Sequence, residues 1–496
     1  MKKKAITHNI FGALSNFLFL FLTSLLLLPY YFKFITASDY GIWLGGISFI
    51  SLISVLEANT GLILTQQLAE KRICNKPIEF SKYLSAAILF GFGVSFFIII
   101  LSFFFKDDLA ILVSKRNFDN EKFSNSFFLY SISLSLTIIS GYLSVVSQVF
   151  LKTLRPPIFN FISSITGIIY TILAIPSQGI VAIAGGNLVK TFVYSILIGF
   201  YGFKILKEEN ISIYFDLNYL SRLLVNIGFP FISKVGITLA VSIQNFIIAT
   251  TISGAATTTF DITRKIPLTI QMFINVIAVS TFTSFSLFYS EQKTNEVRHE
   301  YTEKYFLLIR LLLLFSLTGI FFIGKDFVTI WVGIDKFGGN VLLGLICLAA
   351  LADQLRLLLA QQYTAMGKFN LTSITDIVFA TSFMISAYFL ISFLKLNGIV
   401  LAGILANIIY FIVSYFIEKK YSISMVSNII NKSFFYDLSF IVLVACLTKF
   451  IYETYRGNYF IETTTILIAL SILFIVFYKK NKSLMSFLIF KFGKSS

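Results

Sequence analysis

Ionised side chains that interrupt long apolar segments are the residues of this sequence that could do chemistry. If such a side chain faced lipid, it would cost about 2.5 to 3.5 kcal/mol even on a lenient insertion scale. Most are therefore expected to face a protein interior or a water-filled cavity, where they can bind a charged ligand or take up a proton. The bases are Lys190, Lys234, Arg264, Lys265, Arg310 and Arg356, and the acids are Glu57, Asp261, Asp353 and Asp376.

Two groups of these charges have the spacing of one helix face. Asp261 lies three and four residues before Arg264 and Lys265, and Asp353 lies three residues before Arg356. Each acid can then meet a base on its own helix. One interpretation is a neutralised pair that holds the helix in a bundle. The other is that the surplus base of the first group faces a cavity.

A positive cavity is the functional interpretation of the bases. Lys190 and Lys234 lie near the middle of their apolar segments, and a cavity with several bases suits a substrate that carries phosphate. Arg310 lies nearer the end of its segment, where a long side chain is expected to reach the membrane surface. The candidates for contact with a substrate anion are Lys190, Lys234, Arg264, Lys265 and Arg356.

The acids are candidates for binding a proton or a cation. Glu57 is the only acid in the apolar segments of the first half, and Asn59 and Gly61 follow it. An intramembrane carboxylate of this kind is a coupling candidate by default. The alternative is a Glu57 carboxyl that is buried neutral, or bonded to Asn59 or to a neighbouring helix. Asp376, near the start of its segment, is interpreted as interfacial. The coupling candidates are Glu57, Asp261 and Asp353.

Cysteine and histidine have no spacing that suits a metal or a redox centre. The cysteines are Cys74, Cys347 and Cys446, and His8 and His299 both lie in predicted loops. These separations match no metal-ligand or redox motif. The sequence therefore predicts no metal, no cofactor and no catalytic residue.

The composition is that of an integral membrane protein. Of 496 residues, 57% are hydrophobic and 13% are charged, about half the ~25% charged residues of an ordinary globular chain. The mean hydropathy is +0.84. These values exclude a soluble enzyme, a nucleic-acid-binding module, a disordered scaffold and a secreted disulfide-bonded domain. The net charge of +16 is attributed to Lys and Arg in loops that orient the chain in the bilayer.

Apolar runs long enough to cross a bilayer recur along the whole chain. A bilayer core of about 30 Å needs roughly 20 apolar residues in a helix. The predicted spans are 10–32, 41–65, 84–105, 127–150, 158–175, 179–201, 228–252, 256–282, 306–323, 341–362, 371–393, 399–417, 434–451 and 460–478. The alternating pattern of a β-barrel is absent. We predict an all-α polytopic membrane protein with about 14 transmembrane helices.

An internal repeat predicts two lobes. Gly179-Ile180-Val181 and Gly398-Ile399-Val400 each open an Ala/Gly-rich segment that contains an asparagine. We predict an N-terminal six-helix lobe at 1–203, a cytoplasmic linker at 204–227, a C-terminal six-helix lobe at 228–420, and two further helices with a basic tail at 421–496. Because each lobe has an even number of helices, a pseudo-two-fold axis would run along the membrane normal, as in transporters. The alternative is chance similarity within low-complexity apolar sequence.

Lys and Arg are enriched in alternate loops, which predicts that both termini are cytoplasmic. The basic N-terminus leads into an apolar run that is too long for a signal peptide and has no cleavage pattern, so an uncleaved first helix is expected.

The outer loops are short, and the longest, at 106–122, contains four bases and four acids. Short outer loops disfavour a membrane enzyme with its active site at the outer surface.

Several short motifs resemble those of the polysaccharide-exporting flippases of Wzx type, in the multidrug, oligosaccharidyl-lipid and polysaccharide exporter superfamily. These are a basic start with Asn9 and Asn16, a first helix that ends at Pro29, a Tyr-Gly-Ile-Trp run from Tyr40, and an aromatic-Gly run from Asp326 to Gly333. The chain departs from the family at the end of the second span. The run there is Glu-Ala-Asn-Thr-Gly-Leu instead of Asp-x-Gly-Leu.

The resemblance implies a bacterial inner-membrane flippase for surface polysaccharide biosynthesis. Its substrate would be an undecaprenyl-diphosphate-linked oligosaccharide repeat unit, moved by alternating access with proton or sodium antiport. Membrane lipids and a polysaccharide polymerase are the partners that it implies, with no nucleic acid. Three alternatives stay open: a multidrug or small-molecule exporter of the same superfamily, a membrane-embedded polysaccharide polymerase or ligase, and a structural membrane protein.

Overall fold

The computed structural model describes residues 23, 25–53, 55, 60–115, 120–290, 295–421, 425–430, 432–454 and 471. Within these residues the chain is helical and contains no strand, which confirms the all-α prediction. Seven helices are long and apolar enough to cross a membrane: α4 (Pro77–Ser114), α5 (Asn120–Val149), α6 (Arg155–Gln178), α7 (Ile180–Glu208), α11 (Asn295–Val332), α12 (Asn340–Ala365) and α13 (Phe369–Lys420). The total of 14 spans stays a prediction.

Further helices complete the described part of the chain. They are α2 (Ala37–Ile53), α3 (Thr60–Ile73), α8 (Leu217–Ser242), α9 (Gln244–Thr251), α10 (Gly254–Ser290), α14 (Met425–Ile429) and α15 (Lys432–Thr454), with a 3-10 turn at Ile334–Lys336. The predicted span 41–65 is thus divided between α2 and α3. Most of the predicted outer loop 106–122 is helical, because α4 continues to Ser114 and α5 begins at Asn120.

Both Gly-Ile-Val motifs lie where one long helix turns sharply into the next. Gly179, between α6 and α7, has φ +55°, a backbone conformation that glycine adopts without steric cost. In α13 the chain bends at Lys395, with φ 49° and ψ −124°. A Cβ on Gly398 would lie 2.2 Å from the Leu390 carbonyl oxygen. The predicted spans 371–393 and 399–417 are therefore two arms of α13, joined without a loop.

The chain divides into two compact units. Unit 1 comprises Met1–Asp261 with Phe379–Thr381, and unit 2 comprises Ile262–Val378 with Ser382–Ser496. The division falls within α10, whereas the sequence repeat places the linker between lobes at 204–227. The predicted lobes remain a prediction.

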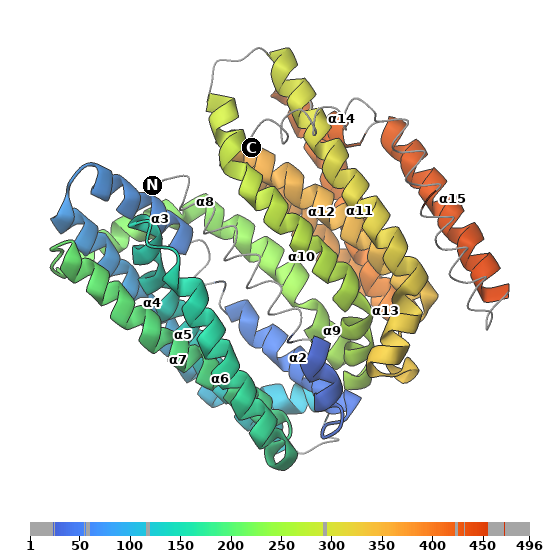
Figure 1. Cartoon of the computed structure of the whole chain (residues 1–496), viewed down its shortest axis with the longest axis horizontal. Coiled ribbons are helices and arrows are strands. Elements are labelled where there is room, and N and C mark those ends of the chain that lie inside the picture. Colours follow the sequence, from blue (N-terminus) through green and yellow to red (C-terminus); the bar gives the residue numbers. More distant parts are fainter. Residues whose placement is uncertain are drawn as a thin grey trace. The chain divides into compact units, whose positions relative to one another are not determined.

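In unit 1, α5 packs between α4 and α7, and α6 packs on α7. Figure 1 shows these four helices side by side. Small and hydroxyl residues mediate the packing of α4 on α5: Ser95 Oγ donates to the Ser135 carbonyl at 3.0 Å, and Ser135 Oγ donates back to the Ser95 carbonyl at 3.2 Å. In a bilayer, where apolar surfaces gain little by meeting each other, such close contacts and hydrogen bonds hold helices together.

In unit 2, α11 packs against α12 and α15. Arg310 of α11 pairs with Asp437 of α15, with Nη2 and Oδ2 3.2 Å apart. Its guanidinium carbon also lies 5.6 Å from the ring centroid of Phe434. Arg310 is only 4% exposed, so the expectation that it reaches the membrane surface is wrong. A partner on a different helix offsets part of the cost of burying this charge.

Candidate functional site

Lys190 of α7 lines two polar cavities in unit 1. One cavity, of about 520 Å³, lies between α5, the start of α6 and α7. The other, of about 250 Å³, lies between α2, α6, α7 and the helical residues 25–31. Asn187 and Lys190 line both cavities. Hydroxyl and amide groups around them are those of Tyr31, Tyr40, Tyr130, Ser133, Thr137, Asn160, Ser164, Thr171, Thr191 and Tyr194.

Two glycines position Lys190 by bringing α6 and α7 together. A Cβ on Gly167 would lie 2.6 Å from the Gly186 carbonyl oxygen and 2.8 Å from Lys190 Cβ. A Cβ on Gly186 would lie 1.9 Å from Thr171 Oγ1. Only residues without a side chain allow this approach. Both glycines also line the smaller cavity beside Lys190.

Hydrogen bonds between hydroxyl groups hold the opposite wall. Ser133 and Thr191 place their hydroxyl oxygens 3.1 Å apart, which joins α5 to α7. The Asn187 carbonyl oxygen is a further acceptor for either hydroxyl, at 3.2 Å from Ser133 Oγ and 3.0 Å from Thr191 Oγ1. Within the described part of the chain, no carboxylate forms an ion pair with Lys190. Among the described lining residues, the cavities therefore combine the Lys190 cation with several hydroxyl groups, which suits a hydroxyl-rich anion.

The other predicted anion contacts lie elsewhere or outside the described part of the chain. Arg264 and Lys265 are partly buried on α10, after Asp261, which is itself buried. Lys234 belongs to α8, but its side chain lies outside the described structure, and Glu57 lies outside the described residues. The roles proposed for these residues stay predictions.

Arg356 and Asp353 do meet on α12, as their spacing predicted. Arg356 Nε lies 3.8 Å from Asp353 Oδ1, and Arg356 Nη1 lies 3.8 Å from Asp376 Oδ1 on α13. Asn407, on the second arm of α13, donates to Asp353 Oδ1 at 2.9 Å. This acid cluster, Asp353, Arg356, Asp376 and Asn407, joins three helical segments of unit 2. The guanidinium faces two carboxylates, which favours the interpretation of Arg356 as a link between helices.

Asp376 is the member that sequence reasoning missed. It was interpreted as interfacial because it lies near the start of an apolar run, but it is fully buried. Its partner lies on another helix, and spacing along the chain cannot reveal such a contact. The sequence feature that pointed to a second partner was Arg356 in the middle of an apolar segment. A buried guanidinium needs more hydrogen-bond acceptors than one carboxylate supplies.

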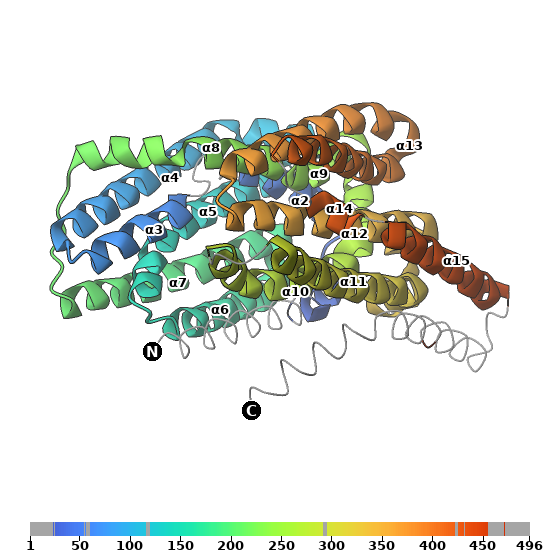
Figure 2. The same ribbon diagram turned by 90° about the horizontal axis from the view of Figure 1, so that it is seen from above.

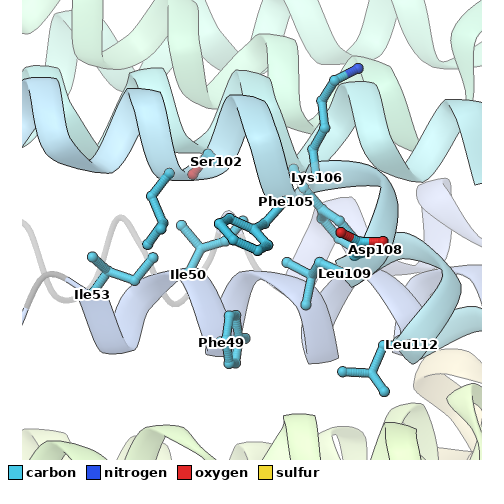
Figure 3. A pocket seen from close by; sticks show the side chains of 11 residues that line it. Phe49, Ile50, Ile53, Ser102, Phe105, Lys106, Asp108, Leu109 and Leu112 are labelled. Carbon is cyan, nitrogen blue, oxygen red and sulfur yellow. The ribbon is translucent and has the colours of Figure 1, made fainter.

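Two further cavities are apolar. A pocket of about 340 Å³ in unit 1 lies between α2 and α4, with Phe49, Ile50 and Leu109 in its lining. Figure 3 shows Lys106 at its edge, extending away from these side chains. In unit 2, a larger apolar groove of about 800 Å³ runs between α12, α13, α14 and α15. An extended hydrocarbon chain has the chemistry that fits such a groove.

Three solved structures show the same fold. "Lipid II flippase MurJ, inward closed conformation" matches with a TM-score of 0.63 and 16% identity, over 90% of this chain and 99% of that one. A MATE multidrug transporter of the MOP superfamily, in an inward-facing conformation, matches with a TM-score of 0.63 and 13% identity, over 80% and 94%.

The third structure is a MOP superfamily transporter from Pyrococcus furiosus, described as having a binding pocket of reverse polarity. It matches with a TM-score of 0.60 and 15% identity, over 84% of this chain and 96% of that one. No family model matches the sequence, and no curated protein matches it. At these identities the likeness concerns architecture alone. The chain has the fold of the MOP superfamily transporters.

Proposed function

We propose that this protein is a flippase for a lipid-linked oligosaccharide whose head carries phosphate. The observation that carries the proposal is the pair of polar cavities around Lys190. Sugars are bound through hydroxyl and amide groups, and lysine is a common phosphate contact. Lys190 supplies the cation, and hydroxyl groups of α5, α6 and α7 surround it.

The apolar groove of unit 2 supports a lipid-linked substrate. Its lining comes almost entirely from aliphatic and aromatic side chains, among them Leu355, Phe411 and Phe434. A chain of isoprene units could lie there while the polar head occupies a separate polar cavity. The finer proposal is an undecaprenyl-diphosphate-linked repeat unit, moved across the bacterial inner membrane toward a polysaccharide polymerase. Alternating access, ion antiport and cytoplasmic termini belong to the same proposal.

A multidrug or small-molecule exporter is the second candidate, because structures described as multidrug transporters share this fold. Lys190, the cation among the described residues that line the polar cavities, disfavours this candidate for cationic drugs. A polymerase or ligase would bind its substrate at the outer surface, where the predicted loop 106–122 is mostly helix.

The test is export in cells that produce the protein. Deletion is expected to cause complete lipid-linked repeat units to accumulate at the cytoplasmic side, with loss of surface polysaccharide. Wild type and Lys190→Arg should restore export, whereas Lys190→Ala should lower it by about tenfold or more, since a charge-assisted contact contributes about 1.5 to 3 kcal/mol. Lys204→Ala is the matched control, because Lys204 is exposed on the same helix.

Each alternative has its own outcome in the same experiment. Single repeat units that accumulate at the outer side would indicate a polymerase or ligase instead. Unchanged polysaccharide together with increased retention of a fluorescent drug would indicate a small-molecule exporter. Full rescue by Lys190→Ala at equal protein level would contradict a role of Lys190 in binding.

A further inference from the structure

One face of the second arm of α13 is polar and fully enclosed in unit 2. Asn407, Tyr410, Ser414 and Glu418 follow one another at three- and four-residue spacing, so they share one face of the helix. The first three are fully buried, and Glu418 is 2% exposed. We call this row of side chains the polar ladder. A row of this kind is costly in a bilayer unless its groups are hydrogen-bonded.

The middle of the polar ladder contains buried polar atoms without a hydrogen-bond partner among the described residues. These atoms are Asn407 Oδ1, Tyr410 Oη and Ser414 Oγ, and both amide atoms of Gln354 on α12 share this property. Tyr410 and Tyr363 both have their hydroxyl groups near Ser414, but out of hydrogen-bond geometry. Polar groups separated in this way are the usual place for a bridging water. Buried water is also the general solution for otherwise unsatisfied groups.

Titratable groups stand at both ends of the polar ladder. At one end is the acid cluster, and the Arg356 guanidinium carbon lies 5.9 Å from the ring centroid of Tyr410. At the other end, Tyr363 donates to Glu418 Oε1 at 2.8 Å, and the Val426 amide donates to Glu418 Oε2 at 2.8 Å. Exposed Lys419 and Lys420 follow Glu418. The ladder thus connects the end of α13 with two carboxylates, the fully buried Asp376 and the partly exposed Asp353.

The charges of the acid cluster favour proton binding. Two carboxylates, Asp353 and Asp376, share one guanidinium among these side chains, with 3.8 Å between each pair of nearest atoms. One proton on either carboxylate brings the summed charge of these three side chains to zero. A summed charge of zero is favoured at Asp376, which is fully buried, because the dielectric constant is low in a protein interior.

We propose that internal water completes the polar ladder into a proton path from the end of α13 at Glu418 to the acid cluster. A proton enters at Glu418, passes through Tyr363, Ser414 and Tyr410 with intervening water, and reaches Asp376 or Asp353. In each transfer one O–H bond breaks and another forms, so no other reactant is needed. The role of this path in coupling a proton to transport rests on the proposed function. The existence of the path does not depend on that function.

The experiment follows the carboxyl proton by infrared spectroscopy on the purified full-length protein in liposomes. A pH titration is expected to show the C=O band of a protonated carboxyl, which Asp376→Asn or Asp353→Asn removes or shifts. After H2O is exchanged for D2O, the band of the wild-type protein should shift within the mixing time. In Tyr410→Phe and Ser414→Ala, the shift should be slower by about tenfold or more, which corresponds to about 1.4 kcal/mol in the barrier.

Tyr142→Phe is the matched control, because Tyr142 is a fully buried tyrosine of α5 in unit 1, far along the chain from the polar ladder. Its exchange should equal that of the wild type. The proposal is overturned if no band of a protonated carboxyl appears over the pH range in which the protein stays folded. It is also overturned if the carboxyl proton exchanges as fast in Tyr410→Phe and Ser414→Ala as in the wild type. No substrate is used, so either result leaves the proposed substrate to be judged by the export experiment alone.

Discussion

Arg310 of α11 and Asp437 of α15 form an ion pair in the interior of unit 2, with 3.2 Å between Nη2 and Oδ2 and with both residues at most 5% exposed. The first of the two additional helices predicted at the C-terminal end is thus attached to unit 2 by a charge contact. Removal of one partner would leave the other charge buried without this ion pair.

Asp437→Ala is expected to lower the free energy of unfolding by about 3 to 5 kcal/mol, the usual effect of breaking a buried pair. Thermal unfolding in detergent, followed by circular dichroism, measures the change. Lys152→Ala is the control: it removes a partly exposed pair with Glu208, for which about 0 to 1 kcal/mol is expected. The double change Arg310→Met with Asp437→Leu should recover most of the loss, and no recovery would argue against the ion pair as the cause.

Gly186 allows the close approach of α6 and α7 beside Lys190. Because a Cβ there would lie 1.9 Å from Thr171 Oγ1 and 2.8 Å from the Gly167 carbonyl oxygen, Gly186→Ala must displace one helix. Overpacking of this kind costs about 1 to 3 kcal/mol, and we expect export to fall with it. Gly141→Ala on α5 is the control, since a Cβ there meets no atom within 4 Å. Equal stability of the two variants would refute the packing argument.

Asp216 caps the N-terminus of α8 and should make stability depend on pH. Its carboxylate accepts from Lys82 Nζ at 2.9 Å and from the Asn218 amide at 3.0 Å, and these contacts, chiefly the one with Lys82, lower the pKa of Asp216. Because the pKa of Asp216 is lowered in the folded state, its carboxylate stabilises the folded protein at pH values above the ordinary aspartate pKa of about 3.9. This stabilisation is lost as the pH falls through the pKa of the folded state.

Asp216→Asn keeps a capping side chain but cannot titrate. The difference in melting temperature between wild type and Asp216→Asn should be largest near neutral pH and shrink as the pH falls below about 4. Melting curves over that range measure it. A difference that does not vary with pH would show that the ion pair with Lys82 contributes nothing.

Gly41 of α2 lies against the start of α10 within unit 1. A Cβ on Gly41 would lie 1.7 Å from the Gly254 carbonyl oxygen, so Gly41→Ala must separate the two helices. In the predicted topology this contact lies at the outer side of the membrane. Labelling of Ser38→Cys by a membrane-impermeant maleimide should therefore rise several-fold when Gly41→Ala is added, in a background without the exposed Cys74 and Cys446. Gly93→Ala, where a Cβ meets no atom within 4 Å, should leave labelling unchanged.

Short-range patterns predicted much of what the structure contains. Low charge and long apolar runs already required membrane helices, because backbone groups in lipid must bond within their own segment. The pair of Asp353 and Arg356 followed from its spacing, since three residues along a helix bring two side chains together. The Gly-Ile-Val repeat predicted two lobes, and the structure places its two copies at sharp helix turns, next to Gly179 and Gly398.

Contacts between helices were decided only by the tertiary structure. Asp376 joins Arg356 from another helix, and Asp437 buries Arg310, which by itself was expected to reach the membrane surface. The extension of α4 to Ser114 through a charged run was equally invisible, because charges signal a loop when only hydropathy is considered. Spacing along a chain reports neighbours on one helix, whereas the partner of a buried charge depends on which helices pack together. That choice is made by the shapes of whole helix faces, so the acid cluster and the polar ladder could be recognised only in the folded protein.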